Sequence, residues 1–148
     1  MREGIGLYKA KRVDNGKWVE GNLVLSNDAQ DDFKAIIIPQ TNNGIFTKHT
    51  GFKNISCYLG FDEWYKVDES TLCQWTGLVD KNEVKVFEGD IVTLRTQADL
   101  EYGFHKRRCD IKFDEYHRFV AVGMTTHPLI DKEEWEVIGN IHDKAVEE

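Results

Sequence analysis

Turn-forming residues recur at short intervals along this chain and separate short runs of β-forming residues. The clearest case is Asn15-Gly16, which lies between two such runs. An Asn-Gly pair is the strongest short hairpin signal, because a type I′ turn needs positive φ at both of its central residues. We therefore predict strands near 7–13 and 17–25, joined by a tight hairpin turn.

The rest of the first half predicts further short strands. The segment AIIIPQ at 35–40 is typical of a buried strand that ends at Pro39, since proline cannot donate a hydrogen bond to a central ladder. The residues at 63–68 are also strand-like. Between them, residues 41–61 mix turn residues with short apolar pieces, so we expect irregular structure there with one or two short strands.

The second half has a clearer strand pattern. The segment RRCDIKF at 107–113 alternates apolar and polar residues with a period of two, as a half-buried strand does. Residues 107–124 therefore predict one hairpin that turns near Asp114–His117, and EWEVIGNI at 134–141 predicts another strand. The helix candidates are short: 28–33 after a possible Asn27 cap, 96–102, and 143–148.

These elements predict a mainly β protein with few short helices. We expect an N-terminal antiparallel β part over 1–70, packed on a C-terminal SH3-like or partly open β-barrel over 71–148. A length of 148 residues fits either one domain or two small β-units that pack together.

Composition limits the class of protein. With 41% hydrophobic residues the chain should fold, yet it has no apolar run long enough for a membrane helix and no signal-peptide pattern at its start. The three cysteines and five histidines are scattered without the spacing of metal ligands or of a disulfide framework. We therefore expect a cytoplasmic protein with reduced thiols and without a metal or other cofactor.

Charge is unevenly distributed. Residues 1–70 have 10 acidic and 9 basic residues, a net charge of −1, whereas 71–148 have 16 and 10, a net charge of −6. Such an acidic chain disfavours sequence-independent binding of nucleic acid. One local group of basic residues could form an interaction surface, or only a solvated strand face that nearby carboxylates dilute: Arg95, Lys106, Arg107, Arg108, Lys112 and Arg118.

The segment CQWTGLVDKNEVKVFEGDIV at 73–92 could contain a phosphate loop, a carboxylate site or only turns. No Gly-Lys-Ser/Thr sequence follows its glycines, so the phosphate loop is excluded. Glu88 and Asp90 could act with Asp110 in metal-dependent chemistry. A glycine between two acidic residues is also typical of a turn that leads into a strand. We favour the structural interpretation, with turn roles for Gly77, Asn82, Gly89 and Asp90 as well as Asn15 and Gly16.

Three segments together resemble the YopX family of phage and prophage proteins: KRVDNGKWVEGNL (11–23), CQWTGLVDKNEVKVFEGDIV (73–92) and WEVIGNIHD (135–143). That family typically shows QYTGL, DKNG, EGDIV and EVIGNI. Here Trp75 replaces the usual Tyr, and Glu83 replaces the usual Gly, which leaves the turn type after Asp80 open. The resemblance implies a β-rich fold and a phage or prophage origin in a bacterial host, but no activity.

Two classes of function remain. The first is a non-enzymatic accessory protein that binds an unknown protein or nucleic acid, because no nucleophile–base pair, metal cluster or cofactor loop is evident. The alternative is a metal-dependent hydrolase or nuclease using Glu88, Asp90 and Asp110. Exposed strand edges also predict homo-oligomerisation. The four tryptophans are expected mostly in the core, although one could be an exposed anchor.

Overall fold

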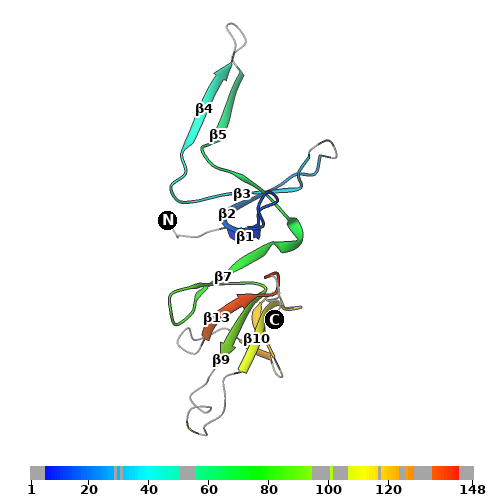
Figure 1. Cartoon of the computed structure of the whole chain (residues 1–148), viewed down its shortest axis with the longest axis vertical. Coiled ribbons are helices and arrows are strands. Elements are labelled where there is room, and N and C mark those ends of the chain that lie inside the picture. The colour runs from blue at the N-terminus through cyan, green and yellow to red at the C-terminus, as the bar shows by residue number, and fades with distance from the viewer. Residues whose placement is uncertain are drawn as a thin grey trace. The chain divides into compact units, whose positions relative to one another are not determined.

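The computed structural model divides the chain into two compact units, Met1–Leu72 and Cys73–Glu148 (Figure 1). Within its described residues the protein is mainly β, with almost no helix, and contains a curled half-barrel sheet, which confirms the predicted fold class. How the two units pack against each other stays a prediction. The described residues are 6–28, 30, 32–50, 56–94, 101, 107–116, 118–123, 126–128 and 135–143.

The N-terminal unit contains an antiparallel sheet of four strands in the order β6-β3-β2-β1. One face of this sheet forms the core, which contains Ala10, Ala35, Ile37 and Val67. The period-two alternation of apolar residues determines which face is buried. A 3-10 helix, η1 (Glu69–Thr71), follows. The strands are β1 (Leu7–Lys11), β2 (Trp18–Leu25), β3 (Ala35–Ile38) and β6 (Tyr65–Val67).

The β1–β2 connection differs from the predicted tight turn. The last paired residues are Lys11 and Trp18, and Arg12 N donates to Lys17 O at 2.9 Å. Gly16 has φ of 70°, but Asn15 is not among the residues with positive φ. The Asn15 side chain accepts a hydrogen bond from Lys17 N at 2.9 Å instead. The type I′ prediction was therefore wrong, because the asparagine serves a longer loop as an Asx turn.

Residues 41–61 are more regular than we expected. β4 (Ile45–Thr50) and β5 (Ser56–Phe61) pair along their whole length as an antiparallel ribbon. We call these two strands the ribbon. Turn residues in the sequence concealed it: Asn42, Asn43 and Gly44 directly precede β4, and Gly60 lies within β5.

The C-terminal unit contains a five-stranded antiparallel sheet in the order β12-β11-β10-β9-β13, which curls as a half-barrel, and a β7–β8 pair. The β10–β11 hairpin turns after Phe113, close to the predicted place, where Asp114 N donates to Arg118 O. The strands are β7 (Cys73–Val79), β8 (Lys85–Phe87), β9 (Asp90–Leu94), β10 (Arg107–Phe113), β11 (Phe119–Val122), β12 (Thr126–Pro128) and β13 (Trp135–Asn140).

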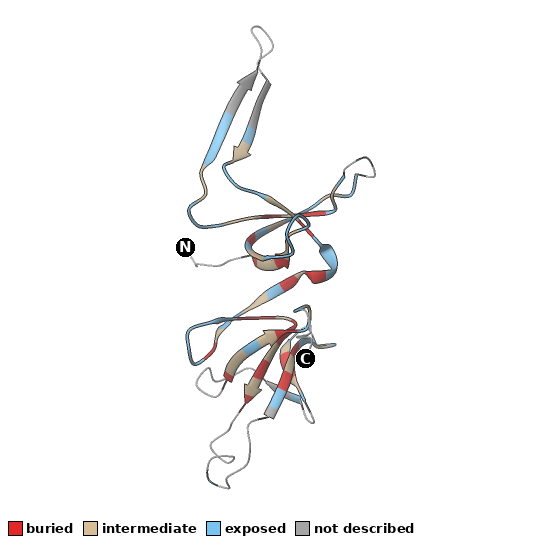
Figure 2. Cartoon of the chain, in the orientation of Figure 1, coloured by how far each residue is buried: buried red, intermediate tan, exposed pale blue. Residues whose placement is uncertain are grey.

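The core of the C-terminal unit lies on one face of the half-barrel, and its buried residues are red in Figure 2. Val92 pairs with both Cys109 and Val137, so alternate residues of three neighbouring strands meet on that face. Buried Trp135 joins them, whereas Trp64 is 47% exposed and Trp18 and Trp75 are half-buried. The expectation that the tryptophans are mostly core residues was therefore wrong for this chain.

The predicted helices have different outcomes. The described part of 28–33 has no helix, and instead Gln30 N donates to the Asp28 side chain at 2.9 Å. The segments 96–102 and 143–148 lie almost wholly outside the described residues. No helix in the described part of the chain is long and apolar enough to cross a membrane.

The loop between β7 and β8 resolves the turn after Asp80. Glu83 N donates to Asp80 O at 3.1 Å, and Asp80 N donates to Val84 O at 2.8 Å. Glu83 has φ of 62°. This is the pattern of a three-residue hairpin loop in which the last residue is left-handed, a position that favours glycine.

We predict that Glu83→Gly raises the free energy of unfolding by about 0.5–1 kcal/mol, because relief of left-handed strain outweighs the added chain entropy. Thermal melts measure the change. Glu83→Ala is the control, since it removes the same side chain but keeps the strain. A Glu83→Gly protein no more stable than Glu83→Ala would contradict the prediction.

Gly77 and Gly89 have almost the same backbone conformation in different surroundings. Their φ values are 87° and 86°. A Cβ at Gly77 would meet nothing within 4 Å, whereas one at Gly89 would lie 3.4 Å from both Cys73 Sγ and Ile141 Cγ1. Gly89 N also donates to Ile111 O at 2.8 Å. Gly89 therefore lies where three segments of the C-terminal unit converge.

We predict that Gly77→Val lowers the free energy of unfolding by about 1–2 kcal/mol, the cost of left-handed φ for a side chain. Gly89→Val should cost about 1–3 kcal/mol more, because its methyl groups also overpack a buried site. Chemical denaturation of both variants provides the comparison. Equal losses would show that the surroundings of Gly89 can accommodate a side chain.

Candidate functional site

The Glu88-Gly89-Asp90 segment forms a buried hydrogen-bond network. The Asp90 side chain is completely buried. Its Oδ2 accepts a hydrogen bond from Phe87 N at 2.8 Å, and its Oδ1 accepts one from Asn140 Nδ2 at 2.9 Å. Asn140 Oδ1 in turn accepts from His142 N at 2.9 Å. Asp90 thus links the start of β9 to the end of β13, and both of its oxygens are engaged by protein donors.

Asp80 performs a similar role at the other end of β13. It is completely buried, and its Oδ1 accepts hydrogen bonds from Asn82 N at 2.8 Å and Val84 N at 2.9 Å. Its Oδ2 accepts one from Val137 N at 2.9 Å. Because buried polar groups without partners are costly, these bonds favour one placement of the β7–β8 loop against β13.

The three carboxylates proposed for metal chemistry do not share a site. Asp110 pairs with Ile91, the neighbour of Asp90 in β9, so Asp90 and Asp110 lie on opposite faces of the half-barrel sheet. Glu88 is half-buried, and its backbone N donates to Gln74 O at 2.8 Å. No metal-binding cluster of His, Cys, Asp or Glu occurs among the residues that the structure describes.

The predicted basic surface is only partly brought together. Arg108 and Lys112 lie on one face of β10 and are exposed, with Asp110 between them on the same face. Arg118 forms an ion pair with Asp114 at 3.0 Å beyond the end of β10. Burial raises the pKa of Asp114, but hydrogen bonds from Arg118 outweigh it and the net shift is downward. Arg107 is described only in its backbone, and Arg95 and Lys106 lie outside the described residues.

A groove of about 470 Å³ lies in the N-terminal unit, between the β1–β2 loop and the segment around Phe33. Two of its cations, Arg12 and Lys66, have carboxylate partners. Lys66 Nζ is 2.6 Å from Asp32 Oδ2, and this ion pair lowers the pKa of Asp32. The groove therefore offers mixed charge rather than a site for an anion.

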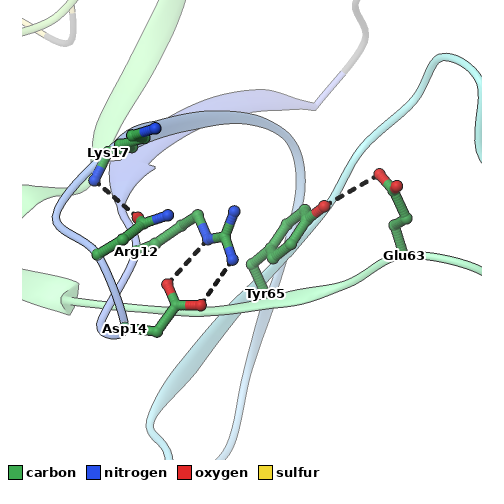
Figure 3. A network of polar contacts seen from close by, with 6 residues as sticks. Arg12, Asp14, Lys17, Glu63 and Tyr65 are labelled. Carbon is green, nitrogen blue, oxygen red and sulfur yellow. Dashed lines mark hydrogen bonds and ion pairs between the residues drawn. The ribbon is translucent and has the colours of Figure 1, made fainter.

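Arg12 lies beside the groove in a network of paired groups (Figure 3). Its guanidinium donates to both Asp14 oxygens, at 2.9 and 2.6 Å, and stacks on Tyr65 with 4.1 Å between Cζ and the ring centroid. The hydrogen bonds from Arg12 lower the pKa of Asp14. Tyr65 donates to Glu63 Oε2 at 3.0 Å, which raises the pKa of the tyrosine. The network joins the β1–β2 loop to β6.

The ribbon exposes apolar side chains that the sequence did not single out. Ile45 is 68% exposed and Leu59 is 60% exposed. Because Ile45 pairs with Phe61 and Thr47 with Leu59, these apolar residues share one face of the ribbon. On the other face the Phe46 ring covers Gly60, where a Cβ would lie 2.5 Å from Phe46 Cζ.

The base of the ribbon is braced against the chain that leads to it. Asn43 Nδ2 donates to Pro39 O at 3.0 Å and to Glu63 O at 2.8 Å, while its Oδ1 accepts from Glu63 N at 2.7 Å. Gly44 N donates to Asp62 Oδ2 at 3.0 Å. Asn43 is therefore a positioning residue that joins the ends of β3 and β6 to the ribbon.

The edges of β6, β13 and β12 are covered or interrupted. Beyond β6, Val13 N donates to Lys66 O and Asp68 N donates to Lys11 O. At β13, Lys81 N donates to Trp135 O in addition to the Asp80 contact. β12 ends in Pro128, which lacks an N–H. Within the described residues, the ribbon strands pair only with each other. The ribbon is thus less protected than these three edges.

These features define a small, two-unit β protein whose buried carboxylates support its fold. The chain matches the YopX protein family model over residues 7–146 and belongs to that family. Its fold is similar to that in the crystal structure of protein EF1440 from Enterococcus faecalis. The two have a TM-score of 0.52 and 22% sequence identity, with 91% of this chain and 92% of that chain covered. Comparison with curated proteins found no match.

We predict that Asp90→Asn lowers the free energy of unfolding by about 1–3 kcal/mol, because its amide would turn a donor toward Phe87 N or Asn140 Nδ2. Asn140→Asp should be destabilising too, since two carboxylates would then meet in the core. The double variant reverses the pair and lets both side chains satisfy Phe87 N and His142 N again.

A double-mutant cycle measured by urea denaturation tests this exchange. We expect the double variant to be more stable than either single variant. Additive losses would mean that Asp90 and Asn140 are not coupled and that the buried hydrogen bond does not determine the stability of this site.

Proposed function

We propose that this chain is a phage- or prophage-encoded accessory protein that acts by binding another macromolecule and does not catalyse a reaction. The observation that carries the proposal is the structural use of Asp90. A carboxylate that accepts hydrogen bonds from Phe87 N and Asn140 Nδ2 while fully buried has neither the access nor the free oxygens that a metal-dependent reaction requires.

The surface chemistry favours a protein partner over nucleic acid. Arg108 and Lys112 share their strand face with Asp110, and Arg118 is paired with Asp114. Phosphate binding depends on cations that are not already neutralised, and the net charge of −7 opposes it at long range. The exposed apolar face of the ribbon has the character of a protein-binding surface instead.

The cytoplasm of a bacterial host is the proposed site of action. Cys73 and Cys109 are buried in the C-terminal unit and form no disulfide with each other. Reduced thiols of this kind are typical of proteins in a reducing compartment.

Calorimetric titration with Mg²⁺, Mn²⁺ and Zn²⁺, followed by incubation with plasmid DNA and RNA, tests the non-enzymatic proposal. We expect no saturable metal binding and no hydrolysis. Asp110→Asn is the informative variant because Asp110 is only half-buried, whereas a change at Asp90 would also disturb the fold. Metal-dependent hydrolysis that Asp110→Asn abolishes without a change in melting temperature would overturn the proposal.

A further inference from the structure

The ribbon leaves the outer edges of both of its strands without a β partner in the described part of the chain. β4 and β5 pair with each other along their whole length, so alternate residues of each strand direct their N–H and C=O groups away from the ladder. A two-stranded sheet is at best marginally stable in water, and three or more strands with an apolar face are needed for independent stability. The ribbon is therefore a sheet that a further strand would stabilise.

The two outer edges differ in how well their sequences prevent strand pairing. Charged side chains and proline are common means of protecting an edge strand. β4 contains Lys48, whereas β5, with the sequence SCYLGF at 56–61, contains neither a charged residue nor a proline. The edges of β6 and β13 are covered by loop hydrogen bonds, and β12 ends in Pro128. The outer edge of β5 is therefore the edge that accepts another strand.

A second copy of the same strand fits this edge. Two identical strands that pair antiparallel are related by a two-fold axis perpendicular to the sheet, so each strand pairs the outward N–H and C=O groups of the other. The same axis keeps corresponding faces of the two ribbons on one side. Leu59 and Phe61, on the apolar face, then adjoin the same residues of the second copy. The result is a four-stranded sheet with one continuous apolar face.

We propose that β5 of one copy pairs with β5 of a second copy along their outer edges. The contact depends on backbone hydrogen bonds and on two-fold symmetry, so it requires no difference in charge between the two copies. It goes beyond the proposed function and does not depend on it, because the apolar face stays on the outside of the four-stranded sheet. A protein partner can still bind there.

Sedimentation equilibrium or light scattering of the full chain measures the association. We expect the mass to rise from 17.1 kDa toward twice that value as protein concentration increases over about 1 to 100 µM. Leu59→Lys should raise the dissociation constant at least about tenfold. The reason is that Leu59 lies near the middle of β5, so the two introduced charges would meet opposite or diagonal to each other across the axis.

The matched control is Ile45→Lys. It introduces the same charge on the same face of the ribbon, and Ile45 and Leu59 are 68% and 60% exposed. Because Ile45 belongs to β4, its substitution lies away from the paired edges and the variant should associate as the parent does. A contact between the apolar faces of two ribbons would instead be weakened by both substitutions.

A charge exchange tests whether the contact is two-fold. Leu59→Glu alone should associate as poorly as Leu59→Lys, because like charges again meet across the axis. An equimolar mixture of the two variants should form a dimer, since opposite charges then meet. Melting temperatures close to the parent value establish that each variant is folded.

Amide hydrogen exchange of the unaltered chain provides a measurement that needs no variant. N–H groups on the outer edge of β5 should exchange more slowly at high protein concentration than at low concentration, because pairing engages them as donors. Those on the outer edge of β4 should exchange at the same rate at both concentrations.

Four results would overturn the proposal. The first is a parent mass of 17.1 kDa at every concentration. The second is an Ile45→Lys variant that associates as poorly as Leu59→Lys. The third is a mixture of folded Leu59→Lys and Leu59→Glu proteins that stays monomeric. The fourth is exchange that slows at the outer edge of β4 and not at that of β5. None of them depends on the metal-binding and hydrolysis assays that test the proposed function.

Discussion

Two buried aspartates hold the C-terminal unit in its described arrangement. Asp80 accepts from Val137 N near the start of β13, and Asp90 accepts from Asn140 at its end. Strands at the margin of a curled sheet leave backbone donors without partners in the sheet. Carboxylates meet this need well, because each oxygen can accept more than one hydrogen bond. The Asp80 loop and the Gly89 turn both depend on these contacts.

This use of acidic residues gives Asp90 of the EGDIV motif a structural role in the C-terminal unit. Asp90 faces the core while Asp110 occupies the opposite face, so the residues that could have formed a metal site are divided by the sheet. The coverage of β6 and β13 by loop hydrogen bonds also limits where a partner can add a strand. The ribbon is left as a distinctive surface with exposed apolar residues.

Local sequence patterns predicted much of the fold but little of the candidate site. The alternation in β10 and β13 located both strands, since one buried face imposes a period of two. The segment 41–61, which contains the ribbon, was expected to be irregular with one or two short strands, because the regularity of the ribbon comes from cross-strand pairing rather than from alternation. Nothing in the sequence indicated that one face of the ribbon is exposed. Isoleucine and leucine, as at Ile45 and Leu59, usually indicate a core.

The sequence by itself determined the β class, the order of the turns and the presence of family motifs such as EGDIV. These features depend on local backbone preferences and on neighbouring residues. Only the tertiary structure decided the role of each polar group. Asp80 contacts Val137, and Asp90 contacts Asn140, across long separations in the chain. Whether a carboxylate is a ligand or a structural acceptor depends on which donors surround it, and folding alone brings those donors together.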